Sequence, residues 1–208
     1  MGFKATASSG DFKPVPAGAH IGRCYQLIDL GTQTEETGMY AGNSSHKIWI
    51  SFELSGEQED GSPLTITTKD GKELPMMISK EYTLSMGEKA NLRKDICAWR
   101  GKQFANDDEA VAFDITKLVG AYGLVNVTHK TSGKGKTYAN IAGISPLPAA
   151  LKNAKPAPVN PNVIFNIDEP DMKLFETLPE FLKEKIRKAP EWTAAAMADS
   201  PLEEGEEF

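Results

Sequence analysis

A strictly alternating run constrains the fold of this chain more than any other feature. Between His46 and Leu54, in HKIWISFEL, every second residue is strongly apolar. The apolar set is Ile48, Ile50, Phe52 and Leu54, and the intervening set is Lys47, Trp49, Ser51 and Glu53. Successive side chains of a β-strand point to opposite faces of its sheet. We therefore expect a strand whose aliphatic face lies in the core, with Trp49 beside Lys47 on the other face.

Other strand-like runs predict a mainly β chain. They cover residues 20–30, 64–85, 121–130 and 136–144. The run 64–85 contains Asp70-Gly71, a dipeptide typical of a tight hairpin turn, so we expect the chain to fold back on itself there.

One helix is predicted inside this β pattern. Ser85 and Glu88 have the spacing of a capping box, which marks helix starts. Leu92, Ile96 and Trp99 then recur at helical spacing before a glycine ends the pattern. This periodicity places Trp99 in the core and not in a binding site.

The stretch His129–Asn140, HKTSGKGKTYAN, has a centre similar to the end of a phosphate-binding P-loop. A P-loop needs a glycine five positions before its Gly-Lys-Thr and a helix directly after it. Lys130 stands where that glycine belongs, and the residues that follow are typical of a strand. We therefore interpret this stretch as a basic β-hairpin whose lysines face a polymer backbone and not a nucleoside triphosphate.

Five strand-like runs with a helix between the third and fourth match the order of an OB-fold barrel. We expect a mainly β protein with a five-stranded, OB-like antiparallel barrel and an inserted helix, followed by a C-terminal helix and a disordered acidic tail. A β-sandwich or another small barrel remains an alternative. The expected divisions are a flexible arm (1–19), the OB-like nucleic-acid-binding domain (20–148), a Pro-rich linker (149–170), short amphipathic helices (171–198) and the acidic tail (199–208). Within the linker, the short apolar run VIFNI (163–167) is a candidate to dock back on the domain.

The charge distribution favours a nucleic-acid partner. The net charge is −6, and residues 191–208 hold six of the 29 acidic residues but none of the 23 basic ones. By contrast, residues 121–155 contain five lysines and no acid. A basic strip with an acidic tail is an asymmetry typical of proteins that bind nucleic acid.

Several function classes receive no support from the residues. Cys24 and Cys97 lie far apart, the three histidines are scattered, and no residue has the setting of an activated nucleophile. We therefore expect no metal, no cofactor and no enzymatic activity. The sequence contains no apolar stretch of about 18 residues, the length that a membrane span needs, and no recognisable secretion signal. We therefore expect a cytoplasmic location.

Candidate DNA-binding residues pair a cation with an aromatic ring on predicted strands. Single-stranded nucleic acid is bound by cations that follow the phosphates and by aromatic faces on which bases stack. The candidates, in falling order, are Lys47 and Trp49; Lys130, Lys134, Lys136 and Tyr138; Tyr122; Lys80 and Tyr82; and Arg23 and Tyr25.

The last residues of the chain carry a family resemblance. They are Glu203, Glu204, Gly205, Glu206, Glu207 and Phe208. This ending resembles the acidic, disordered C-termini of bacterial and phage single-stranded DNA-binding proteins, which also end in Phe. The resemblance implies that these acids and Phe208 bind replication or recombination proteins and compete with DNA. The chain differs from the bacterial pattern because no proline precedes Phe208.

These features predict a sequence-independent single-stranded DNA-binding protein that protects DNA and recruits partners through its tail. The cytoplasm would be that of a bacterial host if the chain is phage-encoded. Two alternatives stay open: a phage structural or adaptor protein that presents its C-terminal helix and tail, and a recombination annealing or mediator protein. RNA binding and assembly into a homo-oligomer also stay open.

Removing residues 199–208 should tighten the binding of single-stranded DNA and change its salt dependence little. A flexible polyanion tethered near the basic hairpin competes with DNA at high effective concentration. Titration of one oligonucleotide with full-length and truncated protein checks this expectation. Unchanged or weaker binding by the truncated protein would contradict it.

Overall fold

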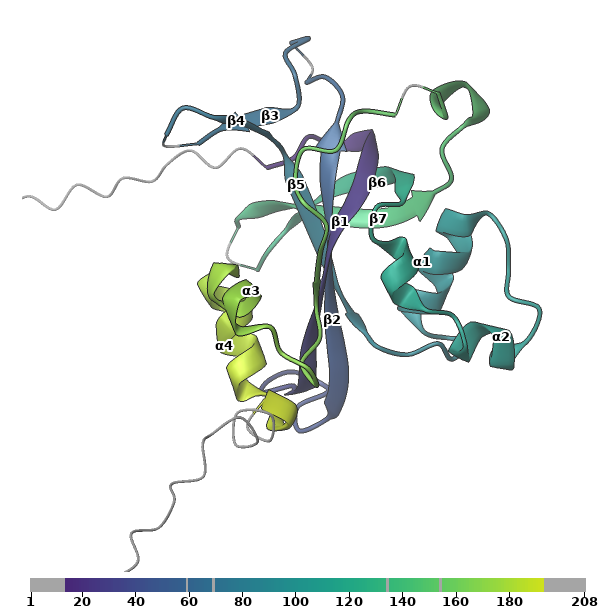
Figure 1. Ribbon diagram of the computed structural model, residues 1–208, viewed down its shortest axis with the longest axis vertical. Coiled ribbons are helices and arrows are strands. Elements are labelled where there is room, and N and C mark those ends of the chain that lie inside the picture. Colours follow the sequence, from purple (N-terminus) through teal and green to yellow (C-terminus); the bar gives the residue numbers. More distant parts are fainter. Residues whose placement is uncertain (1–13, 59, 69, 134, 154, 193–208) are drawn as a thin grey trace, which may run out of the picture.

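The computed structural model describes residues 14–192 except positions 59, 69, 134 and 154, and the protein is mainly β. The main sheet contains β1 (Gly18–Thr34), β2 (Ser44–Ser55), β5 (Met77–Thr83), β6 (Tyr122–Thr131), β7 (Thr137–Ser145) and β8 (Val163–Phe165), and a separate hairpin contains β3 (Thr65–Thr67) and β4 (Glu73–Pro75). The helices are α1 (Asn91–Arg100), α2 (Asp107–Val111), α3 (Met172–Thr177) and α4 (Glu180–Lys188), with 3-10 turns at Ile115–Leu118 and Ala149–Leu151. Figure 1 shows α1 and α2 on one side of the sheet and α3 and α4 on the other.

The alternation in β2 has the predicted consequence. Its aliphatic set is buried in the core, at 0–3% exposure for Ile48, Ile50, Phe52 and Leu54. The strands follow the order β5-β2-β1-β6-β7 with antiparallel neighbours, and β8 pairs with β1 in parallel. The predicted strands and the inserted helix are therefore present, and the helix lies between β5 and β6.

The sheet is open, so the closed barrel expected from the sequence is not formed. Among the described residues no ladder joins β5 to β7, the two ends of the strand order. In the middle of the order, β1 pairs with β2 from Ile21 to Thr34 but with β6 only from Gly18 to Arg23. Arg23 pairs with Tyr122, the first residue of β6, and farther along β1 the residues 26–28 pair with β8 instead.

The first core lies between the sheet and α1. Leu92, Ile96 and Trp99 of α1 are buried there, as their spacing predicts. The Trp99 ring packs against Phe52 with 5.3 Å between centroids, and its indole N–H donates to the Tyr122 carbonyl at 2.9 Å. A buried tryptophan needs such an acceptor, so this helix is fixed in position as well as packed.

A second core lies on the opposite face of β1. It is formed with residues 155–192, called here the C-terminal segment. Ile28 and Leu30 of β1 pack there with apolar residues of β8, α3 and α4 and the segments beside them, namely Phe165, Ile167, Phe175, Leu178, Leu182, Ile186 and Ala189. The predicted linker (149–170) is therefore partly a strand, because it contains β8, which pairs with β1. The predicted arm up to residue 13 and the tail 199–208 lie outside the described residues.

Gly31 allows the C-terminal segment to approach β1 closely. It follows the second bulge of β1 and has a φ of +67°, in the left-handed region. A Cβ at this position would lie 2.6 Å from the Ala189 Cβ and 2.7 Å from the Ile167 Cδ1. A side chain would therefore be strained and would also collide with the second core.

Replacing Gly31 with Ala should lower the free energy of unfolding by about 2–5 kcal/mol. About 1–2 kcal/mol comes from the left-handed backbone and about 1–3 kcal/mol from overpacking. Gly42→Ala is the matched control, because Gly42 has a φ of +85° but nothing within 4 Å of the added Cβ. Urea denaturation measures both; equal decreases would show that contact with the C-terminal segment contributes nothing.

Candidate nucleic-acid interface

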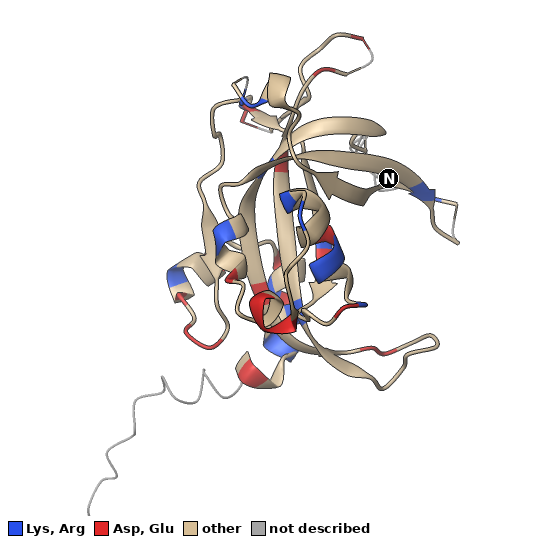
Figure 2. Cartoon of the chain, turned by 90° about the vertical axis from the view of Figure 1, so that its right-hand side faces the viewer, with Lys and Arg blue, Asp and Glu red and all other residues tan. Residues whose placement is uncertain are grey.

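The β6–β7 hairpin brings together the cations and the aromatic ring predicted for this stretch. Lys130 lies directly opposite Tyr138 in the ladder, and Lys136 precedes Tyr138 by two positions. Lys130 and Tyr138 therefore share one face of the hairpin, and Lys136 lies in the turn just before β7. Lys130 and Lys136 are exposed, and Tyr138 is 45% exposed. The hairpin projects from the body and carries basic residues near its tip (Figure 2).

The turn of this hairpin connects two strands, which confirms the predicted strand-to-strand hairpin in the glycine-rich stretch. Gly135 has a φ of +76° and donates its N–H to the Ser132 carbonyl at 2.8 Å. The Ser132 hydroxyl accepts from the Lys136 N–H at 3.1 Å. A strand, β7, follows the turn where a P-loop would require a helix. Lys134, the remaining predicted lysine, lies outside the described residues.

No described acid neutralises the hairpin lysines, a property that they share with other surface lysines such as Lys94 and Lys117. Lys130 and Lys136 take part in no ion pair among the described residues. Elsewhere, Lys47, Lys80, Arg93, Arg100, Lys183, Lys185, Arg187 and Lys188 each pair with a carboxylate. The positive charge of the hairpin is thus available to an external anion.

Lys47 and Trp49 share the outer face of β2, as the alternation predicts, but both have partners. The Lys47 Nζ lies 3.3 Å from the Glu35 Oε1, and the lysine side chain is 14% exposed. Trp49 is half-buried and meets Phe181 of α4 edge-on, with 5.5 Å between ring centroids. Trp49 therefore presents only part of its ring to solvent.

Lys80 and Tyr82 are held by the first core. Tyr82 is 4% exposed, and its hydroxyl donates to the Asp95 Oδ2 at 2.8 Å. Burial and the nearby Asp95 charge raise the pKa of Tyr82. The Lys80 Nζ lies 2.6 Å from the same Asp95 oxygen. Both side chains line a cavity that also contains Lys47, but the Tyr82 ring exposes too little surface there for a base to stack on it.

Arg23 forms a buried polar network with the C-terminal segment. Its Nε donates to the Glu53 Oε1 at 2.5 Å, and its other nitrogens donate to the Asn162 side chain and the Asn160 carbonyl. The Asn160 backbone and side-chain amides and the Val159 N–H donate to Glu53 in turn. Burial alone would raise the pKa of Glu53, but these hydrogen bonds outweigh it and hold the pKa below its ordinary value.

The two remaining tyrosines lie against other parts of the chain. The Tyr122 hydroxyl donates to the Pro156 carbonyl at 2.6 Å, and the Lys155 Nζ lies 5.4 Å from its ring centroid. Tyr25 is 9% exposed, its hydroxyl donates to the Met77 Sδ at 2.8 Å, and burial raises its pKa to about 12. Tyr25 nevertheless lines a cavity that is open to solvent.

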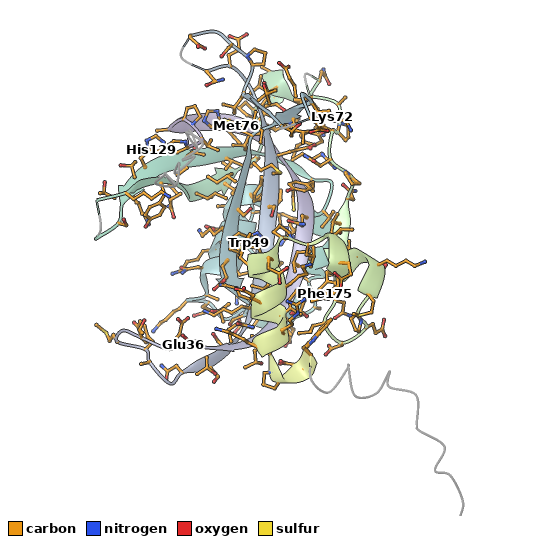
Figure 3. All side chains as sticks on the ribbon, turned by 90° about the vertical axis from the view of Figure 1, so that its left-hand side faces the viewer. Glu36, Trp49, Lys72, Met76, His129 and Phe175 are labelled. Carbon is orange, nitrogen blue, oxygen red and sulfur yellow. The ribbon has the colours of Figure 1, made fainter. Side chains whose placement is uncertain are left out.

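This cavity, called here the β2–β5 groove, has a volume of about 330 Å³. It is lined by Val15, Tyr25, Gln26, Trp49, Ser51, Ile66, Met76, Met77, Ser79, Pro179, Phe181 and Leu182. Three of its apolar side chains are unusually exposed, Ile66 at 38%, Met77 at 43% and Phe181 at 49%. Figure 3 shows Trp49 next to α4, Met76 farther up the same face, and His129 on the hairpin that extends to the left of that face.

The groove adjoins the basic hairpin through one residue. Val15 lines the groove, and its carbonyl accepts a hydrogen bond from the His129 Nε2 at 2.8 Å. His129 directly precedes Lys130 on β6. The apolar groove and the cationic hairpin are therefore neighbouring parts of one surface.

Phe181 is a site residue that the sequence pattern did not indicate. In α4, one of the amphipathic helices expected over 171–198, Leu182 and Ile186 are buried but the neighbouring Phe181 is 49% exposed. These two lie four positions apart on one side of the helix, whereas Phe181 is about 100° away from Leu182 around the helix axis. That angular offset was the available signal that Phe181 faces a different environment.

Metal-binding groups do not gather in the described part of the chain. No set of three or more His, Cys, Asp or Glu residues in it is placed to hold a metal ion. Cys24 and Cys97 are buried free thiols, and burial raises the pKa of Cys24 to about 12, so it stays neutral. Of the described helices, none has the length and apolar character needed to cross a bilayer.

Comparison with protein-family models found no match, and a comparison with curated proteins found none either. The function of this surface is therefore argued from its geometry and chemistry.

Replacing Arg23 with Met should lower the free energy of unfolding by about 3–5 kcal/mol, because Glu53 would stay buried without its cation. The DNA binding expected from the sequence should keep its salt dependence in this variant, since Arg23 is only 4% exposed and faces the C-terminal segment. The double variant Arg23→Met/Glu53→Leu should recover part of the missing stability. A reduced salt dependence in a folded Arg23→Met protein would instead place Arg23 in the DNA site.

An acid titration provides the control for this network. The folded-state pKa of Glu53 is lower than its ordinary value of 4.5, so the unfolded chain binds the proton more strongly. The stabilisation of the fold by ionised Glu53 is therefore complete when the pH is above 4.5, and it is lost as the pH falls through the lowered pKa of Glu53. Glu53→Gln should be less stable than the unchanged protein at neutral pH, and the difference should shrink on acidification.

Proposed function

We propose that this protein binds single-stranded DNA without sequence selection. The observation that carries the proposal is the exposed β6–β7 hairpin, which pairs Lys130 with Tyr138, carries Lys136 at its turn and has no described acid that neutralises these lysines. Lysines in series attract a phosphate backbone, and an exposed ring provides a stacking face for a base. Neither interaction distinguishes one base from another.

An OB-like arrangement of the sheet supports this proposal. The order β5-β2-β1-β6-β7, with a helix between β5 and β6, corresponds to the strand order of an OB-fold that is left partly open. OB-folds bind oligonucleotides across their second and third strands and with the loop between their fourth and fifth strands. In this chain those elements are β2, β5 and the tip of the β6–β7 hairpin.

Single strands fit this surface better than a duplex does. Base faces are accessible for stacking only when the bases are unpaired, and the surface offers Tyr138 on the hairpin and aromatic side chains in the adjoining groove. The hairpin cations alone would serve either form of DNA. The rings therefore favour the single-stranded form.

The acidic residues 199–208 would act as a partner-binding tail in this proposal, and their competition with DNA for the hairpin would regulate access. The adaptor alternative requires the C-terminal helix to be free for a partner. That requirement fits poorly with α4, because Leu182 and Ile186 are buried against the sheet at 1% and 0% exposure. Single-stranded DNA binding is thus the function that the geometry favours.

Replacing Lys130, Lys134 and Lys136 together with Gln should weaken DNA binding and reduce the salt slope. The slope of the logarithm of affinity against the logarithm of salt concentration should fall by about one for each phosphate that the variant no longer binds. The melting temperature should not change, because the Lys130 and Lys136 side chains are exposed and belong to neither core. Titrations with single-stranded DNA, duplex DNA and RNA of one length measure the slope and the preference.

Lys94, Lys117 and Lys173 provide a charge-matched control, since all are exposed and lie outside the hairpin. Their replacement with Gln removes the same net charge but should leave the salt slope nearly unchanged. If both triple variants show the same decrease in affinity, binding reflects overall charge and not the hairpin. If the unchanged protein binds none of the three nucleic acids, the proposed function is wrong.

A further inference from the structure

We infer that the β2–β5 groove receives one unstacked nucleobase of the bound strand, and that the C-terminal helix α4 completes this site through Phe181. The inference rests on the proposed function and extends it, because it assigns part of the DNA site to a segment that the sequence separates from the binding domain. The occupant is a single planar base, and the phosphates on either side of it stay outside the groove.

The walls of the groove have the chemistry that a base face requires. Trp49 of β2 and Phe181 of α4 meet edge-on at 5.5 Å with 67° between their planes, so their rings form a corner and not a closed stack. Phe181 is 49% exposed, and the exposed Met77 also lines the groove. Aromatic and thioether side chains favour contact with a flat, polarisable ring.

The groove also contains a polar chain, which a purely apolar ligand would not require. The Ser79 hydroxyl donates to Ser51, and the Ser51 hydroxyl donates to the Gln26 Oε1, each at 2.9 Å. This chain fixes the Gln26 amide, and within the described residues its Nε2 donates to no acceptor. An amide held in this way can form hydrogen bonds with the polar edge of a base whose faces contact the walls.

The size and position of the groove also fit a base. Its volume of about 330 Å³ lies at the small end of ligand pockets, which extend from about 300 to 1,000 Å³. Through Val15 it adjoins His129 at the base of the cationic hairpin. A strand whose phosphates follow the hairpin would therefore pass the groove and could insert a base there.

An abasic strand separates base recognition from backbone binding. The protein should bind a thymidine oligonucleotide more tightly than an abasic strand of equal length and charge. Phe181→Ala should weaken thymidine-strand binding by about 5- to 150-fold, the range expected when one stacked ring is removed, and should leave abasic-strand binding unchanged. Phe181→Leu, which retains an apolar side chain against Trp49, should show a smaller decrease and guards against a folding defect.

Met172→Ala is the matched control, because Met172 is an apolar residue of α3 that is 45% exposed and does not line the groove. It should change neither affinity. Equal binding of both strands, with no effect of Phe181→Ala, would overturn the base site but leave backbone binding intact. Absence of salt-dependent binding to either strand would instead reject the proposed function itself.

A peptide of residues 199–208 tests the competing occupant. The base site predicts that this peptide, added at equal concentration to the unchanged protein and to Phe181→Ala, binds both alike. Phe181-dependent binding of the peptide, together with equal affinity for thymidine and abasic strands, would make the groove a peptide site and overturn the inference.

Discussion

The structure depends on β1 being buried on both faces. Leu27 belongs to the first core and the adjacent Ile28 to the second, and both are at most 5% exposed. Leu27 and Ile28 are successive residues of one strand, so their side chains point to opposite faces of the sheet. The outer face of β1 therefore has to be covered, and the C-terminal segment covers it with β8, α3 and α4. The Arg23–Glu53 network attaches the same segment at the end of β1 where β6 pairs.

This covering determines which predicted site residues remain available. Trp49, Tyr122 and Arg23 all contact residues after position 150, and each contact reduces their exposure to solvent. The β6–β7 hairpin extends beyond the region that the C-terminal segment covers, so Lys130, Lys136 and Tyr138 stay exposed. The candidate interface is consequently located at the hairpin and at the adjoining groove, and not along the whole face of β2.

Local patterns in the sequence predicted most of the elements, because each depends on neighbouring residues. The alternation of β2, the helical spacing of Leu92, Ile96 and Trp99, and the basic hairpin are all confirmed. Finer details were less accurate. Helix α1 begins after Ala90, without a side-chain cap, and not at the capping box formed by Ser85. The Asp70-Gly71 turn has a positive φ at Gly71 but not at Asp70, so it is not the type I′ turn that the dipeptide favours.

Contacts between distant segments could not be predicted from one sequence. The pairing of β8 with β1 joins residues more than 130 positions apart, and prolines around it indicated a linker. The ion pairs that neutralise Lys47 and Lys80 depend on Glu35 and Asp95, whose positions follow from the fold. Sequence patterns thus identified residue types suited to DNA, but tertiary packing decides which of them reach solvent.

The C-terminal segment both covers the outer face of β1 and supplies one wall of the groove. Leu182 and Ile186 anchor α4 in the second core, while Phe181 on an adjoining side of the same helix forms a wall of the groove. Lys185 of this helix also pairs with Glu81 of β5, so the helix is attached to both neighbouring strands of the groove face. A site built in this way exists only when the C-terminal segment is docked. Because docking itself is required to bury the outer face of β1, the stability of the fold and the shape of the groove depend on the same contacts.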